Sequence, residues 1–142
     1  MFFGKPESYE WYAKRCLLYI RVSTEEQVRH GYSLDAQLEE LQEYAKQFCM
    51  NVVGIYTDDG VAARKEVHKR KGLTALLESV ERGETDYILF IKLDRWFRSV
   101  REYYKTQDIL DRHNVGWKAI LEDYDTSTTN GRLNLNIRLS VA

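Results

Sequence analysis

The sequence is poor in cysteine and proline and contains no long apolar run. A membrane-spanning helix needs about 20 consecutive apolar residues, and residues 1–14 lack the continuous apolar stretch of a signal peptide. The only cysteines are Cys16 and Cys49, so a small scaffold held together by several disulfides is excluded. These absences favour a reduced, cytoplasmic protein that has no membrane partner.

Histidine is scarce as well, which bears on metal binding. His30, His68 and His113 are scattered along the chain, and with the two distant cysteines they form no known spacing of metal ligands. We therefore interpret all five side chains as structural and expect no metal site.

An excess of positive charge is also missing, because 21 basic and 22 acidic side chains give a net charge of −1. This balance argues against a simple basic nucleic-acid-binding protein. The charge is unevenly distributed, however. Residues 64–71 hold five basic side chains and one acidic side chain. Residues 92–105 hold five basic side chains and two acidic ones. A neutral total can therefore hide a local anion-binding site.

Apolar residues, in contrast, make up 44% of the 142 positions, which fits one domain with a substantial core. Short apolar runs alternate with segments of helical periodicity, and this alternation predicts an α/β domain. We expect a mostly parallel central sheet of four to five strands, flanked by helices and joined by right-handed crossovers. The strands are expected at 16–22, 52–56, 87–91 and 117–121, and the helices at 34–48, 73–80 and 99–114.

Local signals mark where two of these helices begin. Ser33 is a suitable N-cap for the first helix, and Ser99 with Glu102 forms the capping-box pattern at the start of the third. Asn114 and Gly116 are suited to end that third helix. Its buried face is expected to consist of Val100, Tyr103, Tyr104 and Leu110.

Groups suited to phosphate chemistry follow two of the predicted strands. Ser23 comes directly after the first strand, and Asp94, Arg95 and Arg98 come after the third. The carboxyl ends of parallel strands share one edge of a sheet, and neighbouring strands lie about 5 Å apart. Arginines such as Arg21 could therefore converge on the serine, and guanidinium groups bind phosphate through paired hydrogen bonds. This pattern predicts phosphoryl transfer with a serine nucleophile and with Asp94 as a proton-exchanging or orienting group.

Each of these residues also has a structural interpretation. The serine could cap a turn, and Asp94 with Arg95 could be a surface ion pair that contributes little stability. Residues 64–71 could be a solvated loop, and Gln37 could lie on the exposed face of its helix. Against these alternatives stands the coincidence of three arginines and a serine at one predicted sheet edge. No histidine lies in either stretch, which disfavours a Ser-His-Asp hydrolase.

Four motifs follow one another along the chain and point to a known family. They read Tyr-Ile-Arg-Val-Ser-Thr-x-x-Gln at 19–27, Ser-Leu-Asp-Ala-Gln at 33–37, Arg-Lys-Gly-Leu at 70–73, and Leu-Asp-Arg-x-x-Arg at 93–98. In this order and approximate spacing they resemble the catalytic domain of the serine recombinases. That is the resolvase–invertase family, with its large integrase and transposase members. The resemblance extends from about Cys16 to the end, and the N-terminal extension favours the large-recombinase branch.

The resemblance implies a mechanism and a set of roles. Ser23 would attack a DNA phosphodiester, giving a 5′-phosphoserine link and a free 3′-hydroxyl, before strand exchange and religation. It implies no metal or nucleotide cofactor, with double-stranded DNA as substrate and self-association to a dimer and a synaptic tetramer. The other implied site residues are Arg21, Arg95 and Arg98 at the phosphate, Asp94 and Arg70 beside them, Gln27 and Gln37 in support, and Tyr19 and Lys92 as further contributors.

The chain ends place limits on what this unit is expected to do. Residues 1–14 are interpreted as an N-terminal extension, and residues 15–142 as the catalytic domain. Periodicity permits either a strand or a helix at 131–142, but the resemblance favours the start of the family's long dimerisation helix, truncated there. We therefore expect the chain alone to bind DNA weakly and to recombine it poorly or not at all.

Two other classes of function compete with a recombinase. A phospho-acceptor receiver domain would need an acidic pair after the first strand, where this chain has Arg21 and Ser23. A regulatory or assembly domain could carry the same motifs without using them. Substitution of Ser23 by alanine separates this last alternative from an enzyme.

Overall fold

The computed structural model describes residues 14–22, 33–59, 70–97 and 99–122. In these ranges strands and helices alternate, with one extra short helix before α6. In chain order the elements are β1 (Arg15–Val22), α3 (Leu34–Gln47), β2 (Asn51–Asp59), α4 (Lys71–Glu81), β3 (Tyr87–Phe90), α5 (Leu93–Trp96), α6 (Val100–Arg112) and β4 (Gly116–Ala119).

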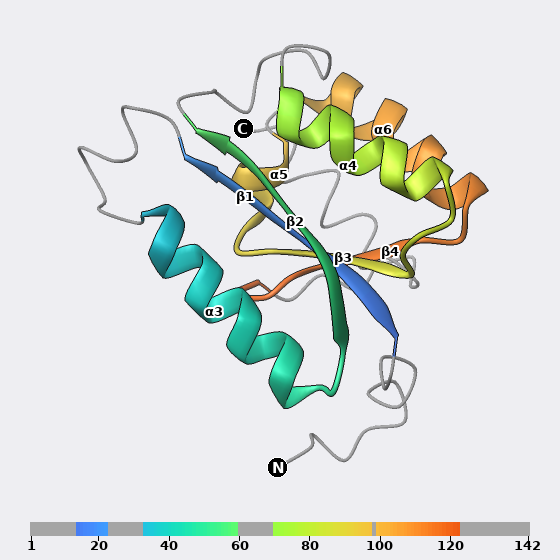
Figure 1. Ribbon diagram of the computed structural model, residues 1–142. Coiled ribbons are helices and arrows are strands. Elements are labelled where there is room, and N and C mark those ends of the chain that lie inside the picture. The colour runs from blue at the N-terminus through green and yellow to red at the C-terminus, as the bar shows by residue number, and fades with distance from the viewer. Residues whose placement is uncertain (1–13, 23–32, 60–69, 98, 123–142) are drawn as a thin grey trace.

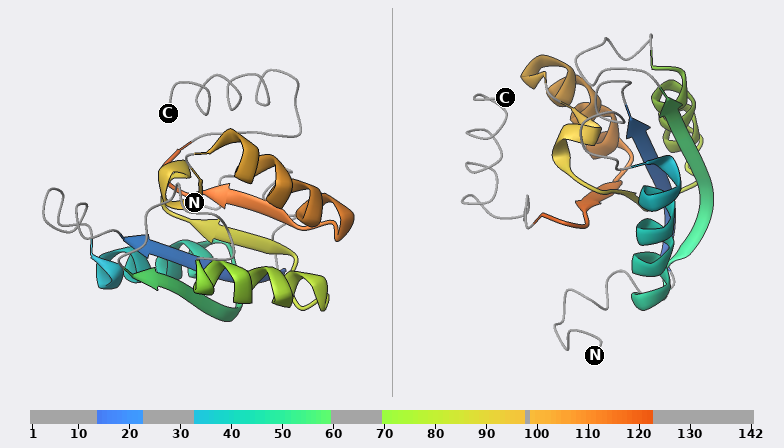
Figure 2. Two further views of the ribbon diagram at one scale, coloured as in Figure 1. Left: turned by 90° about the horizontal axis from the view of Figure 1, so that it is seen from above. Right: turned by 90° about the vertical axis from the view of Figure 1, so that its left-hand side faces the viewer.

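The four strands form one parallel sheet in the order β2-β1-β3-β4. Helix α3 covers one face, and α4 and α6 cover the other (Figures 1 and 2). The predicted α/β class, the parallel sheet and the flanking helices are therefore confirmed. The described residues include no helix that is long and apolar enough to span a membrane.

Strand β1 lies inside the sheet and is buried on both faces, as its continuous apolar sequence predicts. Successive side chains point to opposite faces, so the strand serves two cores. Leu17 and Tyr19 pack on the side of α4 and α6, whereas Leu18 and Ile20 pack on the side of α3. Arg21 consequently points to the same face as Tyr19.

Both predicted N-caps are present. The Ser33 hydroxyl accepts the N–H of Ala36 at 3.1 Å at the start of α3, and the Ser99 hydroxyl accepts the N–H of Glu102 at 3.3 Å at the start of α6. Asn114 has a φ of 55°, the left-handed conformation expected of a residue that ends a helix.

The structure corrects part of the predicted core. Tyr103 and Leu110 of α6 are buried, but Val100 and Tyr104 are 36% and 42% exposed. The buried stripe of α6 instead runs along Glu102, Thr106 and Leu110, which lie four residues apart on one side of Tyr103. Glu102 and Thr106, which the predicted buried face did not include, are therefore part of it.

Strand boundaries differ from the prediction at both edges of the sheet. Strand β2 continues to Asp59, whereas the sequence placed the end of that strand before Asp58. Strand β4 covers Gly116–Ala119, two residues short of the predicted end. The four-residue helix α5 was not predicted, because its sequence is too short to show a helical period.

Candidate active site

The sequence-predicted site residues that the structure describes gather at the carboxyl ends of β1, β2 and β3. Arg21 lies one residue before the end of β1, opposite Asp58 of β2 in the sheet register. Helix α5 follows β3 after a two-residue turn and lies beside the end of β1 (Figure 1). This edge is the one at which parallel α/β sheets assemble their functional groups.

The short helix α5 is the platform of this site. Its first N–H group, that of Leu93, donates to the Glu122 carboxylate at 2.6 Å. A helix end leaves its last carbonyl groups without partners in the helix, and in α5 two of these carbonyls belong to Asp94 and Arg95. Arg21 donates to both, through Nη2 to Asp94 at 2.7 Å and through Nε to Arg95 at 3.2 Å. The Arg21 guanidinium thus ties the end of β1 to helix α5, which carries Arg95.

A second arginine contacts the same carbonyl oxygen. Nη2 of Arg70 lies 3.4 Å from the main-chain oxygen of Arg95, which also accepts from Arg21. Both guanidinium side chains are fully buried, and the side chain of Arg95 is largely buried too. Cations buried together repel each other and lose hydration, so an anion bound among them would be strongly stabilised.

A hydrogen-bonded chain connects Arg70 to the end of β2. The Tyr19 hydroxyl accepts from Nη2 of Arg70 at 2.8 Å and donates to the Asp58 carboxylate at 2.7 Å. Burial raises the pKa of the Tyr19 hydroxyl far above its ordinary value, whereas the nearby Arg70 acts in the opposite direction. The hydroxyl therefore remains protonated and continues to donate to Asp58.

Asp58 is the site residue that the sequence prediction missed. The sequence places it after the second strand, at the sheet edge where functional groups gather, but gave it no role. In the fold its carboxylate also accepts the N–H groups of Gly72 at 2.7 Å and Leu73 at 3.0 Å, at the start of α4. A carboxylate at a helix N-terminus is electrostatically favourable. The available signal was an acidic residue ending a strand, followed by the basic segment that leads into a helix.

Gln37 is buried, so the interpretation that places it on the exposed face of α3 is wrong. Its side-chain nitrogen donates to the main-chain oxygen of Arg21 at 3.2 Å. Gln37 therefore holds the backbone of β1 where the strand delivers Arg21 to the site.

Two more predicted residues lie at the outer rim. The Asp94 side chain is 41% exposed and lies 3.5 Å from Nη1 of Arg95, whose side chain is only 7% exposed. This pair is half-buried, so it differs from the solvent-exposed ion pair considered as the structural alternative. Lys92 is exposed and precedes α5 in extended conformation. Ser23, Gln27 and Arg98 lie outside the described residues, as does residue range 131–142.

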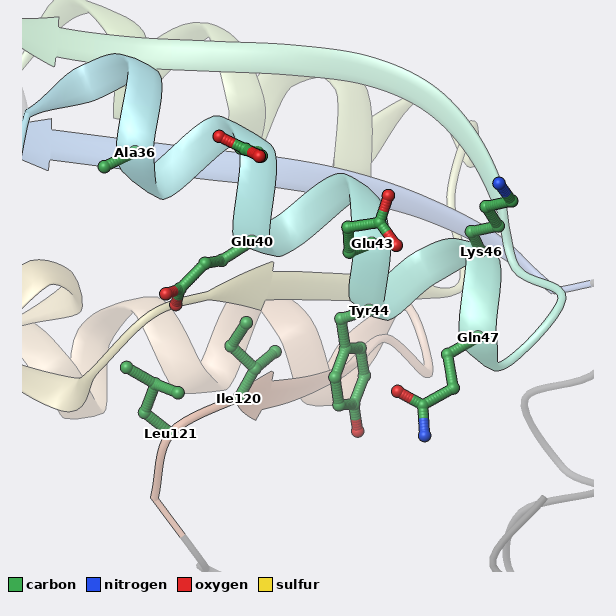
Figure 3. A pocket seen from close by; sticks show the side chains of 9 residues that line it. Ala36, Glu40, Glu43, Tyr44, Lys46, Gln47, Ile120 and Leu121 are labelled. Atoms are coloured by element: carbon green, nitrogen blue, oxygen red, sulfur yellow. The ribbon is translucent and has the colours of Figure 1, made fainter. Parts of the chain in front are cut away.

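A groove lies elsewhere, between α3 and the residues that follow β4 (Figure 3). Its lining includes three glutamates, Glu39, Glu40 and Glu43, against one lysine, Lys46. This acidic lining repels phosphate, so the groove is a poor candidate for the predicted chemistry. Across the residues that the structure describes, no cluster of three or more potential metal ligands occurs.

Comparison with known proteins gives a consistent result. The family model described as "Resolvase, N terminal domain" matches residues 16–142. The solved N-terminal catalytic domain of TP901-1 integrase is 34% identical, with a TM-score of 0.73 over 90% of this chain and 92% of that one.

Two curated relatives differ in how much of their length the chain spans. A probable DNA-invertase of Sinorhizobium fredii is 30% identical over 129 residues, which are 91% of this chain but only 37% of the invertase. An uncharacterized immunity region protein 3 of Bacillus phage phi105 is 41% identical over 66 residues, which are 46% of this chain and 78% of that protein.

Proposed function

The chain belongs to the resolvase N-terminal domain family, and from this membership we propose that it is the catalytic domain of a site-specific DNA recombinase acting through Ser23. In the proposed reaction the Ser23 oxygen forms a bond to the phosphorus of a DNA phosphodiester as the bond to the 3′ oxygen breaks. The serine loses its hydroxyl proton, and the departing 3′ oxygen gains one. Attack by a 3′-hydroxyl on the phosphoserine reverses these steps and rejoins the strand.

One observation carries the proposal: two buried guanidinium groups meet at a single carbonyl at the carboxyl end of β1. Arg21 and Arg70 both lie within hydrogen-bonding distance of the Arg95 oxygen. Val22 is the last residue of β1, and Ser23 is the next residue in the sequence. A nucleophile in that position would have the cationic cluster beside it.

The cluster suits the charge that develops in phosphoryl transfer. Negative charge accumulates on the non-bridging oxygens and on the leaving oxygen, and preorganised donors stabilise it without further reorganisation. Each well-placed donor of this kind is worth about 3 kcal/mol in the transition state. We assign this work to Arg21, Arg70 and Arg95 and, by the motif, to Arg98.

The remaining predicted residues take supporting roles in the proposal. Asp94, at the half-exposed rim, would orient Arg95 or exchange a proton with the 3′ oxygen. Gln37 holds the backbone of Arg21. We assign Gln27 to the DNA side of the site by its motif, and Lys92 by its position directly before the motif at 93–98.

DNA and further copies of the chain are the proposed partners. The net charge of −1 leaves little general attraction for a DNA backbone, so we expect these 142 residues by themselves to bind DNA weakly. We propose residues 15–142 as the catalytic unit. Since the chain spans 37% of the related invertase, target recognition would depend on other parts of such a protein.

The direct test is capture of the covalent intermediate. Protein expressed from its complete gene is incubated with nicked fragments of host genomic DNA, denatured in detergent, and examined for DNA that remains attached. We expect an adduct in which Ser23 carries a 5′-phosphate, and we expect Ser23→Ala to abolish it while DNA binding persists. Ser33→Ala, which removes only a helix cap, is the matched control and should retain the adduct. An adduct of unchanged yield in Ser23→Ala would overturn the assignment.

A further inference from the structure

The guanidinium of Arg70 lies over the faces of two aromatic rings. Its central carbon is 4.8 Å from the ring centroid of Phe97 and 5.4 Å from that of Tyr19. All three side chains are buried, with exposed fractions of 0% for Arg70, 1% for Phe97 and 0% for Tyr19. At these distances a cation is attracted by the negative face of an aromatic ring, and the attraction is strongest when water is absent.

This attraction is an important part of what stabilises the buried Arg70 charge, because Arg70 makes few hydrogen bonds. Nη2 donates to the Tyr19 hydroxyl and to the Arg95 oxygen, whereas Nε and Nη1 are buried without a hydrogen-bond partner in the described part of the chain. No carboxylate there is hydrogen-bonded to Arg70, since Asp58 reaches it only through Tyr19. A buried cation with two unused donors is poised to receive an anion.

Phe97 is itself fixed from several directions. Its N–H donates to the Leu93 oxygen at 2.8 Å, at the point where α5 ends and the chain becomes extended. Its ring makes edge contacts with the rings of Trp96 and Tyr103, at centroid distances of 5.3 and 6.5 Å. The ring therefore cannot turn away from Arg70 without disturbing its own packing.

We propose that Phe97 is a positioning residue for the recombination site. Its ring face holds the Arg70 guanidinium so that Nε and Nη1 are directed at the scissile phosphate. The inference rests on the proposed function, because it assumes that the anion Arg70 receives is a DNA phosphate. Phe97 would then have a role in the reaction in addition to its packing in the hydrophobic core.

The test varies the ring's electrostatics while its shape is nearly preserved. In the protein expressed from its complete gene, Phe97 is replaced by phenylalanine carrying one, two or three ring fluorines, which progressively weaken the negative ring face. The rate of covalent adduct formation is measured at saturating DNA together with the half-saturating DNA concentration. We expect the saturated rate to fall stepwise, by about tenfold for the trifluoro ring, with a smaller change in half-saturation.

The matched control is the same series at Phe90, a fully buried ring that stacks on Trp96 at 4.8 Å. Fluorination there should leave the saturated rate within about twofold, because no cation depends on that ring in our proposal. Equal effects at positions 97 and 90, or none at 97, would overturn the inference while leaving the recombinase proposal intact. Absence of any adduct in the unmodified protein would instead overturn the proposed function.

Phe97→Leu supplies a second measurement that needs no fluorinated residue. Leucine retains apolar volume but has no ring face, so the saturated rate of Phe97→Leu should again fall by about tenfold. Phe97→Tyr keeps a ring face, so its saturated rate should stay close to that of the unmodified protein. Melting temperatures of both variants, and of Phe90→Leu, show how much each substitution destabilises the fold. A rate loss that simply follows melting temperature across the three variants would contradict a positioning role.

Discussion

The carboxylate of Asp58 accepts the backbone N–H of Gly72 at 2.7 Å and thereby ties the end of β2 to the start of α4. The same carboxylate accepts the Tyr19 hydroxyl, which in turn accepts from Arg70. One buried acidic group thus joins two secondary-structure elements and the cationic side of the candidate site.

Asp58→Asn should lower the free energy of unfolding by about 2 kcal/mol. The new amide places an NH₂ group where a carboxylate oxygen accepts from Gly72, Leu73 or Tyr19, and at least one donor is then left buried and unsatisfied. Urea unfolding measures the change. Asp108→Asn, at an exposed position of α6, is the control and should have a much smaller effect. Equal losses in the two variants would argue against a central role for Asp58.

Gly72→Ala should destabilise the fold by about 3 kcal/mol, because the new methyl group has no space. A Cβ at this position would overlap the main-chain oxygen of Thr57 and lie 3.1 Å from the Asp58 carboxyl carbon. Relief requires α4 to move away from β2, which also moves Arg70. Gly83→Ala is the comparison: nothing lies within 4 Å of its Cβ, but its φ of 73° should still cost about 1 kcal/mol. Thermal unfolding of both variants measures the two losses of stability. A larger loss for Gly83→Ala than for Gly72→Ala would contradict the prediction.

Gln37→Leu should cost about 1–2 kcal/mol of stability and slow adduct formation. The substitution removes a buried donor to the main-chain oxygen of Arg21, so the end of β1 is held less firmly. Gln42→Leu changes the same residue type on the exposed side of the same helix, and it should alter stability by less than about 0.5 kcal/mol. Indistinguishable unfolding curves for the two variants would show that the buried hydrogen bond contributes nothing measurable.

Asp86 should contribute to stability at neutral pH and lose that contribution in acid. Hydrogen bonds from the Arg15 side chain, at 3.1 Å to each carboxylate oxygen, lower the pKa of Asp86 below its ordinary value. A carboxyl whose pKa is lower in the folded state stabilises the fold above its unfolded pKa of about 3.9 and ceases to do so as the pH falls through the folded value.

Asp86→Asn should therefore be less stable than the parent by about 0.5–1 kcal/mol at pH 7, a modest figure because the pair is partly exposed. The difference should shrink as the pH is lowered below about 4. Urea unfolding at a series of pH values measures it, with Asp108→Asn on the exposed side of α6 as the control. A difference that is independent of pH would rule out the Arg15 pair as its source.

Local patterns in the sequence were sufficient to predict the class of fold and the order of its elements. Continuous apolar runs identify strands buried on both faces, and Ser33 and Ser99 mark helix starts, because burial and capping depend on neighbouring residues. The motif around Arg21 and the motif around Arg95 could be placed at one sheet edge from topology alone. The fold confirms that these two arginines lie together.

Only the tertiary structure decided which groups support that site. Arg21 donates to Asp94 across 73 positions of sequence, and Tyr19 donates to Asp58 across 39. Such contacts depend on strand register and on the short helix α5, and neither has a local signature in the sequence. Asp58 was consequently given no role, and an exposed position stayed an alternative for Gln37, since a polar residue is expected in solvent until the fold supplies a buried partner. Residue type and spacing therefore determined the chemistry that we propose for this chain, and long-range packing determined how its charged groups are held.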